Sequence, residues 1–293
     1  MFDIKALHEA ESVAHAVTLM QEHPAARLIA GGSDVLIKVR EGKYAGCELI
    51  SIYGLDELRG VALSDGGDLR IGPLTAFSGL EESPLIQEKI PVLAQAAGSV
   101  GGPQVRNIGT VGGNICNGVT SADTASTLLA WDAVLELTGP AGVRTCPIGD
   151  FYVSAGKVDI KPFELLTAIT IPRESLAGYH GWFIKYSMRG AMDIATTNCS
   201  VNVKLTPDCL EIENVRAAFG VAAPVPVRAP YAEALVRGTY VAEEAVFDFA
   251  QAILVDIKPR TSWRAPKEFR EHIAVEMAKR ALTESVKRAM GVA

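Results

Sequence analysis

The feature that most constrains this chain is a glycine-rich stretch near its middle. Residues 98–114 carry two Gly-Gly pairs on either side of Pro103, and the stretch ends in Thr110, Val111, Gly112, Gly113 and Asn114. Glycine has no side chain, so such a backbone can approach a ligand closely or adopt a positive φ. Successive N–H groups of such a loop can also converge on an anion such as a diphosphate. We therefore expect a binding loop here.

A second stretch has the same character. Residues 28–30 are apolar and run into Gly31 and Gly32, which Ser33 and Asp34 follow. Together the two motifs indicate one ligand held by two loops. Taken alone, either motif also fits an ordinary strand-to-helix turn with an N-cap. Neither matches G-x-G-x-x-G or the Walker A sequence, so a Rossmann or P-loop nucleotide site is not supported.

Length and charge exclude several classes of protein. The chain has 293 residues, 48% of them hydrophobic, and a net charge of −6 without a long basic run, which argues against a nucleic-acid partner. Such a length allows one large domain or two to three ordinary ones. The first residues lack the apolar segment of a signal peptide, and the longest apolar run, residues 217–227, is too short to span a bilayer. We expect a cytoplasmic protein without a membrane partner.

The five cysteines are Cys47, Cys116, Cys146, Cys199 and Cys209, scattered without any C-x-x-C spacing. Their odd number and spacing argue against a disulfide framework and against a metal or iron–sulfur site in this chain. We interpret them as mostly buried thiols. Cys116 differs from the other four cysteines because it lies just after the central glycine motif.

The first part of the chain mixes short strands and helices. The patterns predict helices at 11–22, 77–80, 84–97 and 124–130, strands at 27–30, 48–52 and 165–171, and hairpins at 61–71 and 134–147. Asp65, Gly66 and Gly67 supply the turn of the first hairpin. Asp123 suits the N-cap of the helix after it, and it could equally contact a ligand. These two roles are compatible.

The pattern changes after a linker predicted at 172–181. Strands at 182–186, 198–205 and 210–219 precede helices at 229–237, 242–257 and 266–289. This order predicts a second α+β domain from about residue 177, a small antiparallel sheet followed by helices. Residues 258–293 carry a net charge of +5, against −11 for residues 1–257. The basic tail is either a solvated helix face or a surface that docks on an acidic protein.

The motifs together resemble a known family. Residues 30–34, 104–107, 110–114 and 122–123, in this order and spacing, resemble the FAD-binding subunit of the molybdenum hydroxylases, which include xanthine dehydrogenases, aldehyde oxidases and carbon monoxide dehydrogenases. Residues 185–195 and 219–228 are similar to the C-terminal domain of these subunits, so the resemblance covers essentially the whole chain. Residues 117–123, 156–158 and 262–270 look most like the separate FAD-binding subunit of bacterial xanthine dehydrogenases.

The resemblance implies an α+β fold of the vanillyl-alcohol-oxidase (PCMH) type. Its FAD-binding domain would span 1–176, as two α/β subdomains at about 1–55 and 56–176, and its C-terminal α+β domain would span 177–293. An extended, non-covalently bound FAD would lie between the two subdomains. Covalent attachment is not expected, because the glycine motifs offer no His or Cys, apart from Cys116 just beyond.

The resemblance also assigns roles to residues. The two glycine motifs would line the diphosphate and ribityl chain through backbone N–H groups and the hydroxyls of Ser33 and Thr110. Leu166 would pack on the flavin ring, and Lys185 would lie near its pyrimidine edge, where a fixed cation raises the cofactor's potential. Without the resemblance, Lys185 is equally a surface lysine at a strand end. The complete predicted set is Leu28, Ile29, Ala30, Gly31, Gly32, Ser33, Asp34, Val35, Gly101, Thr110, Val111, Gly112, Gly113, Asn114, Asp123, Lys157, Leu166 and Lys185.

The chain departs from the family pattern in two places. Val100 stands at a position where the family pattern allows an aromatic residue, and Ser154 and Ala155 stand where Gly-Pro is common. Both departures concern the packing of the flavin ring rather than FAD binding.

The function implied is electron transfer. A molybdenum-cofactor subunit would oxidise a purine, a 2Fe-2S subunit would pass electrons to the FAD of this chain, and NAD would accept hydride. The resemblance implies that these subunits assemble as a dimer of heterotrimers. Three alternatives stay open: a related hydroxylase acting on another heterocycle, an aldehyde or carbon monoxide; a self-sufficient flavin oxidase; and a flavin-free scaffold whose glycine motifs are only turns.

Overall fold

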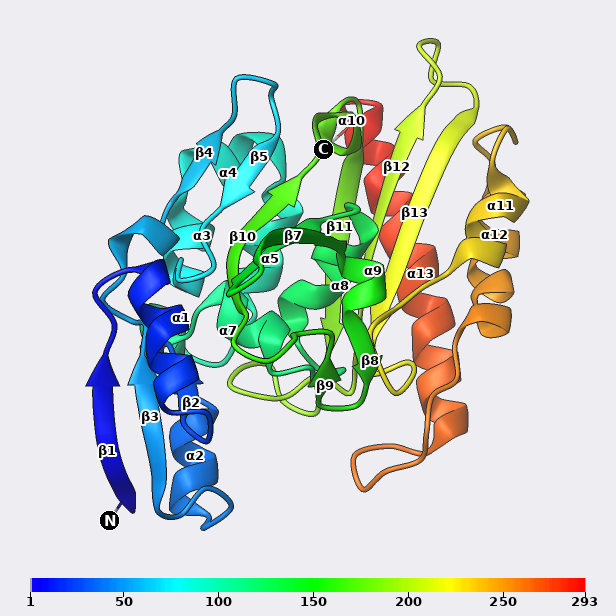
Figure 1. Cartoon of the computed structure of the whole chain (residues 1–293). Helices are drawn as coiled ribbons and strands as arrows, with labels where there is room; N and C mark the ends of the chain where they lie inside the picture. Colours follow the sequence, from blue (N-terminus) through cyan, green and yellow to red (C-terminus); the bar gives the residue numbers. More distant parts are fainter. Residues whose placement is uncertain (1, 293) are drawn as a thin grey trace.

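Three parallel strands begin the chain in a computed structural model that describes residues 2–292 (Figure 1). They are β1 (Ile4–Glu9), β2 (Arg27–Ile29) and β3 (Cys47–Ser51), in the order β1-β3-β2. Helix α1 (Val13–Glu22) packs on them, and Ser12 caps it by accepting a hydrogen bond from the N–H of His15. Helix α2 (Val35–Arg40) follows the first glycine motif. Strand β1 was not predicted from the sequence.

An antiparallel sheet of five strands forms the second unit. Its order is β4 (Val61–Leu63), β5 (Leu69–Ile71), β10 (Leu165–Ile171), β6 (Val134–Gly139) and β7 (Gly142–Pro147). The apolar run of β10 is explained by its central place, where both neighbouring strands and the core cover it. The 3-10 helix η1 (Asp56–Leu58) leads into this sheet, and the small ribbon of β8 (Tyr152–Ser154) and β9 (Lys157–Val158) extends from it.

Short helices pack beside this sheet and carry the central glycine stretch. They are α3 (Phe77–Glu82), α4 (Pro84–Lys89), α5 (Pro91–Gly98), α6 (Pro103–Ile108), α7 (Val111–Cys116), α8 (Asp123–Ala130) and α9 (Ile148–Phe151). The single helix predicted at 84–97 is wrong, because the chain breaks at Ile90, whose α conformation is disfavoured by the following Pro91. The stretch predicted as a loop contains two short helices, α6 and α7.

The C-terminal unit is a four-stranded antiparallel sheet covered on both faces. Its order is β11 (His180–Tyr186), β12 (Thr197–Leu205), β13 (Ile212–Gly220) and β14 (Val227–Arg228). Helix α13 (Lys267–Ala289) packs on β11 and β12, with α12 (Glu243–Asp256) and α11 (Pro230–Val236) beside it (Figure 1). Helices α5 and α8 also contact this sheet, so the second unit and the C-terminal unit share an interface.

The predicted fold class is confirmed, with one correction at the junction. Residues 172–181 were predicted as a linker, but they hold α10 (Arg173–Leu176) and the first residues of β11. The junction is firmly packed because Leu176 and Tyr179 lie against the core of the second unit. Within residues 2–292 we find no helix that is both long and apolar enough to cross a membrane.

Candidate functional site

The two glycine motifs meet backbone to backbone. A Cβ atom added to Gly31 would lie 1.7 Å from the carbonyl oxygen of Ile108, so only glycine allows this contact. The next residue, Gly32, has a φ of +74°, which places it in the left-handed region that favours glycine. The first motif therefore turns sharply against the residues that lead into α7. The contact brings the first motif against the central glycine stretch, as a shared site would require.

The first motif presents free donors. Among residues 2–292, the backbone N–H groups of Gly32, Ser33 and Asp34 donate to no other group of the protein. Consecutive N–H groups around a left-handed residue form a concave nest that binds anions. These three donors, at the start of α2, suit a phosphate group.

The second motif is held differently. Thr110 is the N-cap of α7, and its hydroxyl accepts a hydrogen bond from the N–H of Gly113 at 3.2 Å. The N–H groups of Val111, Gly112 and Asn114 already donate to the carbonyls of Thr75, Pro73 and Thr110. The backbone donors expected here are thus largely used within the protein. The donors that remain are side chains: the Thr110 hydroxyl proton and the Nδ2 of Asn114, whose Oδ1 accepts from Thr124 at 2.7 Å.

The glycines of this second motif have separate structural reasons. A Cβ on Gly112 would lie 2.5 Å from Cβ of Pro73, so this glycine permits packing within the protein. A Cβ on Gly113 would meet only Oγ1 of Thr110, at 2.9 Å. Larger side chains at Gly113 would therefore extend into the space beside the motif rather than into the core.

A loop from the C-terminal unit reaches the glycine stretch. Gly101 has a φ of +49°, and a Cβ on its neighbour Gly102 would lie 3.4 Å from Cγ of Met192. Met192 and Ile194 of this loop are exposed large apolar side chains. We did not single out either residue from the sequence, although both lie in residues 185–195, which carry part of the family resemblance. Exposed apolar side chains beside a glycine turn are a signal that only the structure provides.

A buried ion pair joins the two units behind this stretch. The Nζ of Lys185 on β11 lies 2.6 Å from Oδ2 of Asp123 and donates to the carbonyl of Ser99 at 2.9 Å. The side chains of Lys185 and Asp123 are 10% and 8% exposed. Asn198 adds a hydrogen bond from Nδ2 to Oδ1 of Asp123, at 3.3 Å. The alternative that Lys185 is a surface lysine is therefore wrong.

Asp123 is strongly affected by its burial. Desolvation raises the pKa of Asp123 to about 6, although Lys185 and Asn198 both act to lower it. The predicted N-cap role is wrong, because Ala122 is the N-cap of α8 and Asp123 occupies the first helical position without capping it. Its carboxylate turns instead toward β11 and β12. This choice could not be made from the sequence, since it depends on strands more than sixty residues away.

The last two predicted residues lie apart from this ion pair. Leu166 is buried in β10 within the core of the second unit, and β10 contacts α7. Lys157 is exposed on β9, and it forms no ion pair with any residue that the structure describes. The turn before Lys157 is held by a hydrogen bond from the N–H of Gly156 to the carbonyl of Gly118, at 2.9 Å.

Burial raises the pKa of the Cys116 thiol to about 12, so this group stays protonated at neutral pH.

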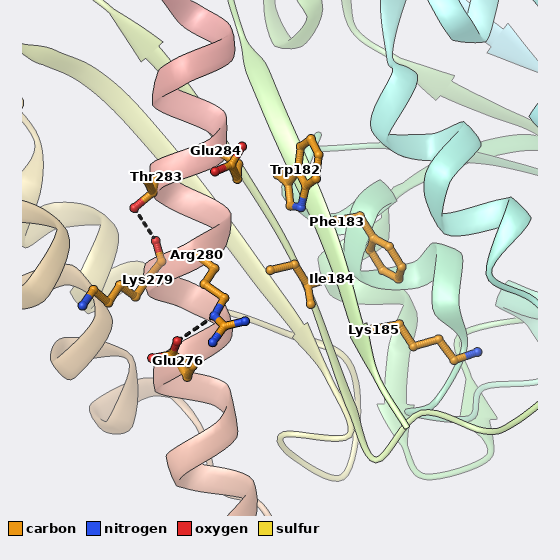
Figure 2. Close-up of a pocket in the computed structure, with 9 residues that line it drawn as sticks. All are labelled: Trp182, Phe183, Ile184, Lys185, Glu276, Lys279, Arg280, Thr283 and Glu284. Atoms are coloured by element: carbon orange, nitrogen blue, oxygen red, sulfur yellow. Dashed lines mark hydrogen bonds and ion pairs between the residues drawn. The ribbon is translucent and has the colours of Figure 1, made fainter. Parts of the chain in front are cut away.

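A groove of about 520 Å³ lies elsewhere, between β11 and α13 (Figure 2). Its charged groups include Arg280, which is paired with Glu276 at 2.6 Å. Lys185 also lines it, but the side chain extends away from α13 in Figure 2, toward its contacts with Ser99 and Asp123. Of the charged residues that line the groove, Arg280 and Glu276 pair with each other and Lys185 pairs with Asp123.

Comparison with known proteins gives consistent matches over the chain. Residues 2–174 match the family described as the FAD binding domain in molybdopterin dehydrogenase, and residues 182–285 match the CO dehydrogenase flavoprotein C-terminal domain. The chain is 42% identical over 291 residues to a putative xanthine dehydrogenase FAD-binding subunit of Escherichia coli (strain K12), with 99% of each chain covered.

Carbon monoxide dehydrogenases provide the second line of comparison. The chain is 32% identical to the carbon monoxide dehydrogenase medium chain of Hydrogenophaga pseudoflava, with 94% of each chain covered. A solved structure of carbon monoxide dehydrogenase from that organism, lacking the Mo-pyranopterin moiety of the molybdenum cofactor, matches with a TM-score of 0.93 and 30% identity, covering 98% of this chain and 99% of that one. The chain therefore belongs to the family of FAD-binding subunits of the molybdenum hydroxylases, the group that includes the xanthine and carbon monoxide dehydrogenase flavoproteins.

Proposed function

We propose that this chain holds a non-covalent FAD at the two glycine motifs and serves as the electron-transfer subunit of a xanthine dehydrogenase-like hydroxylase. The observation that carries the proposal is the nest of free N–H groups at Gly32, Ser33 and Asp34, seated on the second motif by the contact of Gly31 with Ile108. A dinucleotide needs such a site because its diphosphate carries negative charge. The match to a putative xanthine dehydrogenase FAD-binding subunit supports the same reading.

Different residues of the site would bind different parts of the cofactor. In this proposal the nest and the Ser33 hydroxyl bind the diphosphate, while the Thr110 hydroxyl and the Asn114 amide donate to the neighbouring polar atoms of the cofactor. Leu28, Ile29, Ala30 and Val35 complete the first wall. Gly101, Val111, Gly112, Gly113 and Leu166 complete the second, with Lys157 at its margin.

The buried pair of Lys185 and Asp123 would sit at the edge of the ring system. An ammonium group has three donors, and Lys185 uses two of them on Asp123 and Ser99. The third is left to donate to the cofactor, in a position fixed by the pair. FAD, when bound, supplies the ability to accept electrons singly and to pass them on as hydride. Lys185 and Asp123 would tune that ability through the fixed charge near the ring.

The same proposal includes the partners and the acceptor. The sequence has no cysteine spacing for an iron–sulfur cluster, so a 2Fe-2S subunit would deliver the electrons and a molybdenum-cofactor subunit would oxidise a purine. We propose NAD as the hydride acceptor, a dimer of heterotrimers as the assembly and the cytoplasm as the location. We place the domain boundary between residues 176 and 177, and the two family matches end and begin on either side of it.

The experiment is to isolate the tagged full-length chain from its native cells and to record its visible spectrum before and after adding xanthine. Co-purification of molybdenum and iron–sulfur subunits, together with bleaching of a flavin band near roughly 450 nm, would support the whole proposal. A yellow chain with the same partners but no bleaching would contradict the purine substrate and direct attention to other heterocycles and aldehydes. A colourless chain without partners would contradict FAD binding and leave the scaffold alternative.

Replacing Gly113 by Leu tests the site itself. The new side chain extends beside the motif, where only Oγ1 of Thr110 lies close, so it should abolish FAD retention while the chain still folds. The matched control is Gly54→Leu, because no heavy atom lies within 4 Å of a Cβ at Gly54, which is outside both glycine motifs. Normal flavin content in the Gly113→Leu protein would defeat the assignment.

A further inference from the structure

A cluster of three potential metal ligands lies on the N-terminal parallel sheet. It consists of His8 on β1, His23 at the C-cap of α1, and Glu48 on β3. Glu48 is near the start of β3, and His23 precedes β2, whereas the first glycine motif follows the end of β2. Because the strands are parallel, Glu48 and His23 lie toward the end of the sheet away from the glycine motif, and His8, which lies on β1 opposite Ile50, reaches back to Glu48. The cluster therefore does not belong to the proposed FAD site.

The topology explains why these residues meet. In the register of β1 with β3, Ala6 lies opposite Glu48, and His8 follows two residues later on the same face of the strand. An irregularity between Ile4 and Ala6 lets Lys5 also reach Glu48. Helix α1 then runs back along the sheet and ends at His23, which brings this imidazole beside the other two side chains.

The distances suit a single small ion. The Nε2 of His8 and the Nδ1 of His23 lie 3.2 and 3.1 Å from the same oxygen, Oε2 of Glu48. The two rings stack with centroids 3.9 Å apart, and all three ligand atoms lie within 4.8 Å of one another. With bonds of about 2.0 to 2.1 Å, the ligands of a tetrahedral zinc ion are separated by roughly 3.3 to 3.4 Å. The two distances to Oε2 are close to this separation, and the stacked imidazole rings would rotate so that both nitrogens face one ion.

Charge and access also favour a cation. Glu48 supplies a carboxylate oxygen, a ligand that zinc accepts beside imidazole nitrogens. Lys5 binds the other oxygen, Oε1, at 2.6 Å, which leaves Oε2 as a monodentate ligand. The side chains of His8, His23 and Glu48 are 24%, 32% and 22% exposed, so an ion can enter from solvent and keep a water as fourth ligand.

We propose that His8, His23 and Glu48 bind one divalent first-row metal ion, with zinc as the best match. Two imidazoles and one carboxylate are a ligand set that zinc takes readily with a water in the fourth position. Binding needs each imidazole to hold its proton on the ring nitrogen that faces away from Glu48. The ion would tie the edge strand β1 to the end of α1 and to β3, and so stabilise the N-terminal subdomain.

The test uses the full-length chain with its flavin and Zn²⁺ as the probe. Zinc affinity is measured by competition with a chromogenic chelator, and bound zinc is counted by elemental analysis after gel filtration. We expect one zinc per chain for the wild type, and a rise in the unfolding temperature on adding zinc. Loss of a ligand in His23→Gln or Glu48→Gln should weaken binding by about 100-fold or more, because even outer-shell partners of a metal are worth roughly 10- to 100-fold.

The matched control is His272→Gln, which removes an exposed imidazole from α13 and should leave zinc binding unchanged. Circular dichroism and flavin content establish that the variants are folded. If the wild type binds no zinc, or if His23→Gln and Glu48→Gln bind it as tightly as the wild type does, the proposal is overturned. The cluster would then be only a hydrogen-bonded histidine–carboxylate group.

Discussion

Replacing Lys185 by Met should make the free energy of unfolding decrease more steeply with rising pH than it does in the wild type. The change removes the cation and the hydrogen-bond donor that face the Asp123 carboxylate across 2.6 Å. Asp123 is only 8% exposed, so water cannot replace the lost partner. The variant can avoid a buried unpaired charge only by protonating Asp123, which becomes harder as the pH rises.

The magnitude follows from the pKa of Asp123. Burial raises this pKa from 3.8 to about 6 in the folded wild type. Because the folded state holds the proton more tightly, the stability that this group contributes is present below pH 3.8 and is lost as the pH rises through about 6. The total loss is about 3 kcal/mol, at about 1.4 kcal/mol for each unit of pKa.

Without Lys185 the pKa of Asp123 rises further, and the loss continues above pH 6. The difference in unfolding free energy between wild type and Lys185→Met should therefore be small near pH 5. It should grow by about 1.4 kcal/mol per pH unit above about 6, reaching roughly 2 to 3 kcal/mol more at pH 8 than at pH 5.

The assay is urea unfolding followed by circular dichroism at pH 5, 6, 7 and 8, with FAD removed so that cofactor binding does not contribute. Lys204→Met is the matched control, because Lys204 and Glu213 form a pair whose side chains are 35% and 44% exposed. It should cost less than about 1 kcal/mol. Parallel pH curves for wild type and Lys185→Met would refute the reasoning. A double variant that also carries Asp123→Asn should lose the extra slope.

Three further substitutions test the packing around the site and the core. Gly31→Ala places a Cβ against the carbonyl of Ile108, so we expect loss of FAD. The unfolding free energy should fall by more than the roughly 1 to 3 kcal/mol of ordinary overpacking. Flavin absorbance per chain measures FAD binding, and retained flavin would contradict the prediction. Phe249→Ala empties a fully buried site in the C-terminal core and should cost about 3 to 5 kcal/mol, read from the urea midpoint; a cost below about 1 kcal/mol would show that the site collapses. Glu233→Gln removes a buried carboxylate that accepts two hydrogen bonds from Arg228, at 2.8 and 2.9 Å. The unfolding free energy should fall by about 1.5 to 3 kcal/mol. An unchanged melting temperature would contradict this prediction.

Local chemistry was sufficient for several elements. The hairpin of β4 and β5 was predicted because Asp65, Gly66 and Gly67 favour a tight turn between two short apolar runs, and the structure confirms it. The three C-terminal helices were predicted from their apolar spacing and are present as α11, α12 and α13. Strand β1 was missed because it lies at a sheet edge and alternates with charged residues, so its pairing with β3 decides its conformation.

At the glycine motifs, too, part of the structure could be predicted from the sequence and part could not. Their sequence identified both as places of close backbone approach, and the structure confirms that approach for Gly31 and Gly112. The sequence could not reveal that the atoms close to these two glycines would be protein atoms of Ile108 and Pro73. Nor could it reveal that α7 would already use most donors of the second motif, because hydrogen bonds to Thr75 and Pro73 connect residues more than thirty positions apart.

The sequence by itself determined the α+β class, several of the strands and helices, the two glycine motifs and the family resemblance, because these depend on local patterns and residue types. Tertiary structure decided which side chains work together. Asp123 turned from a candidate helix cap into the partner of Lys185, and His8, His23 and Glu48 became one cluster. The physical reason is that strand register and the burial of charge are set by packing between distant segments, which no local pattern contains.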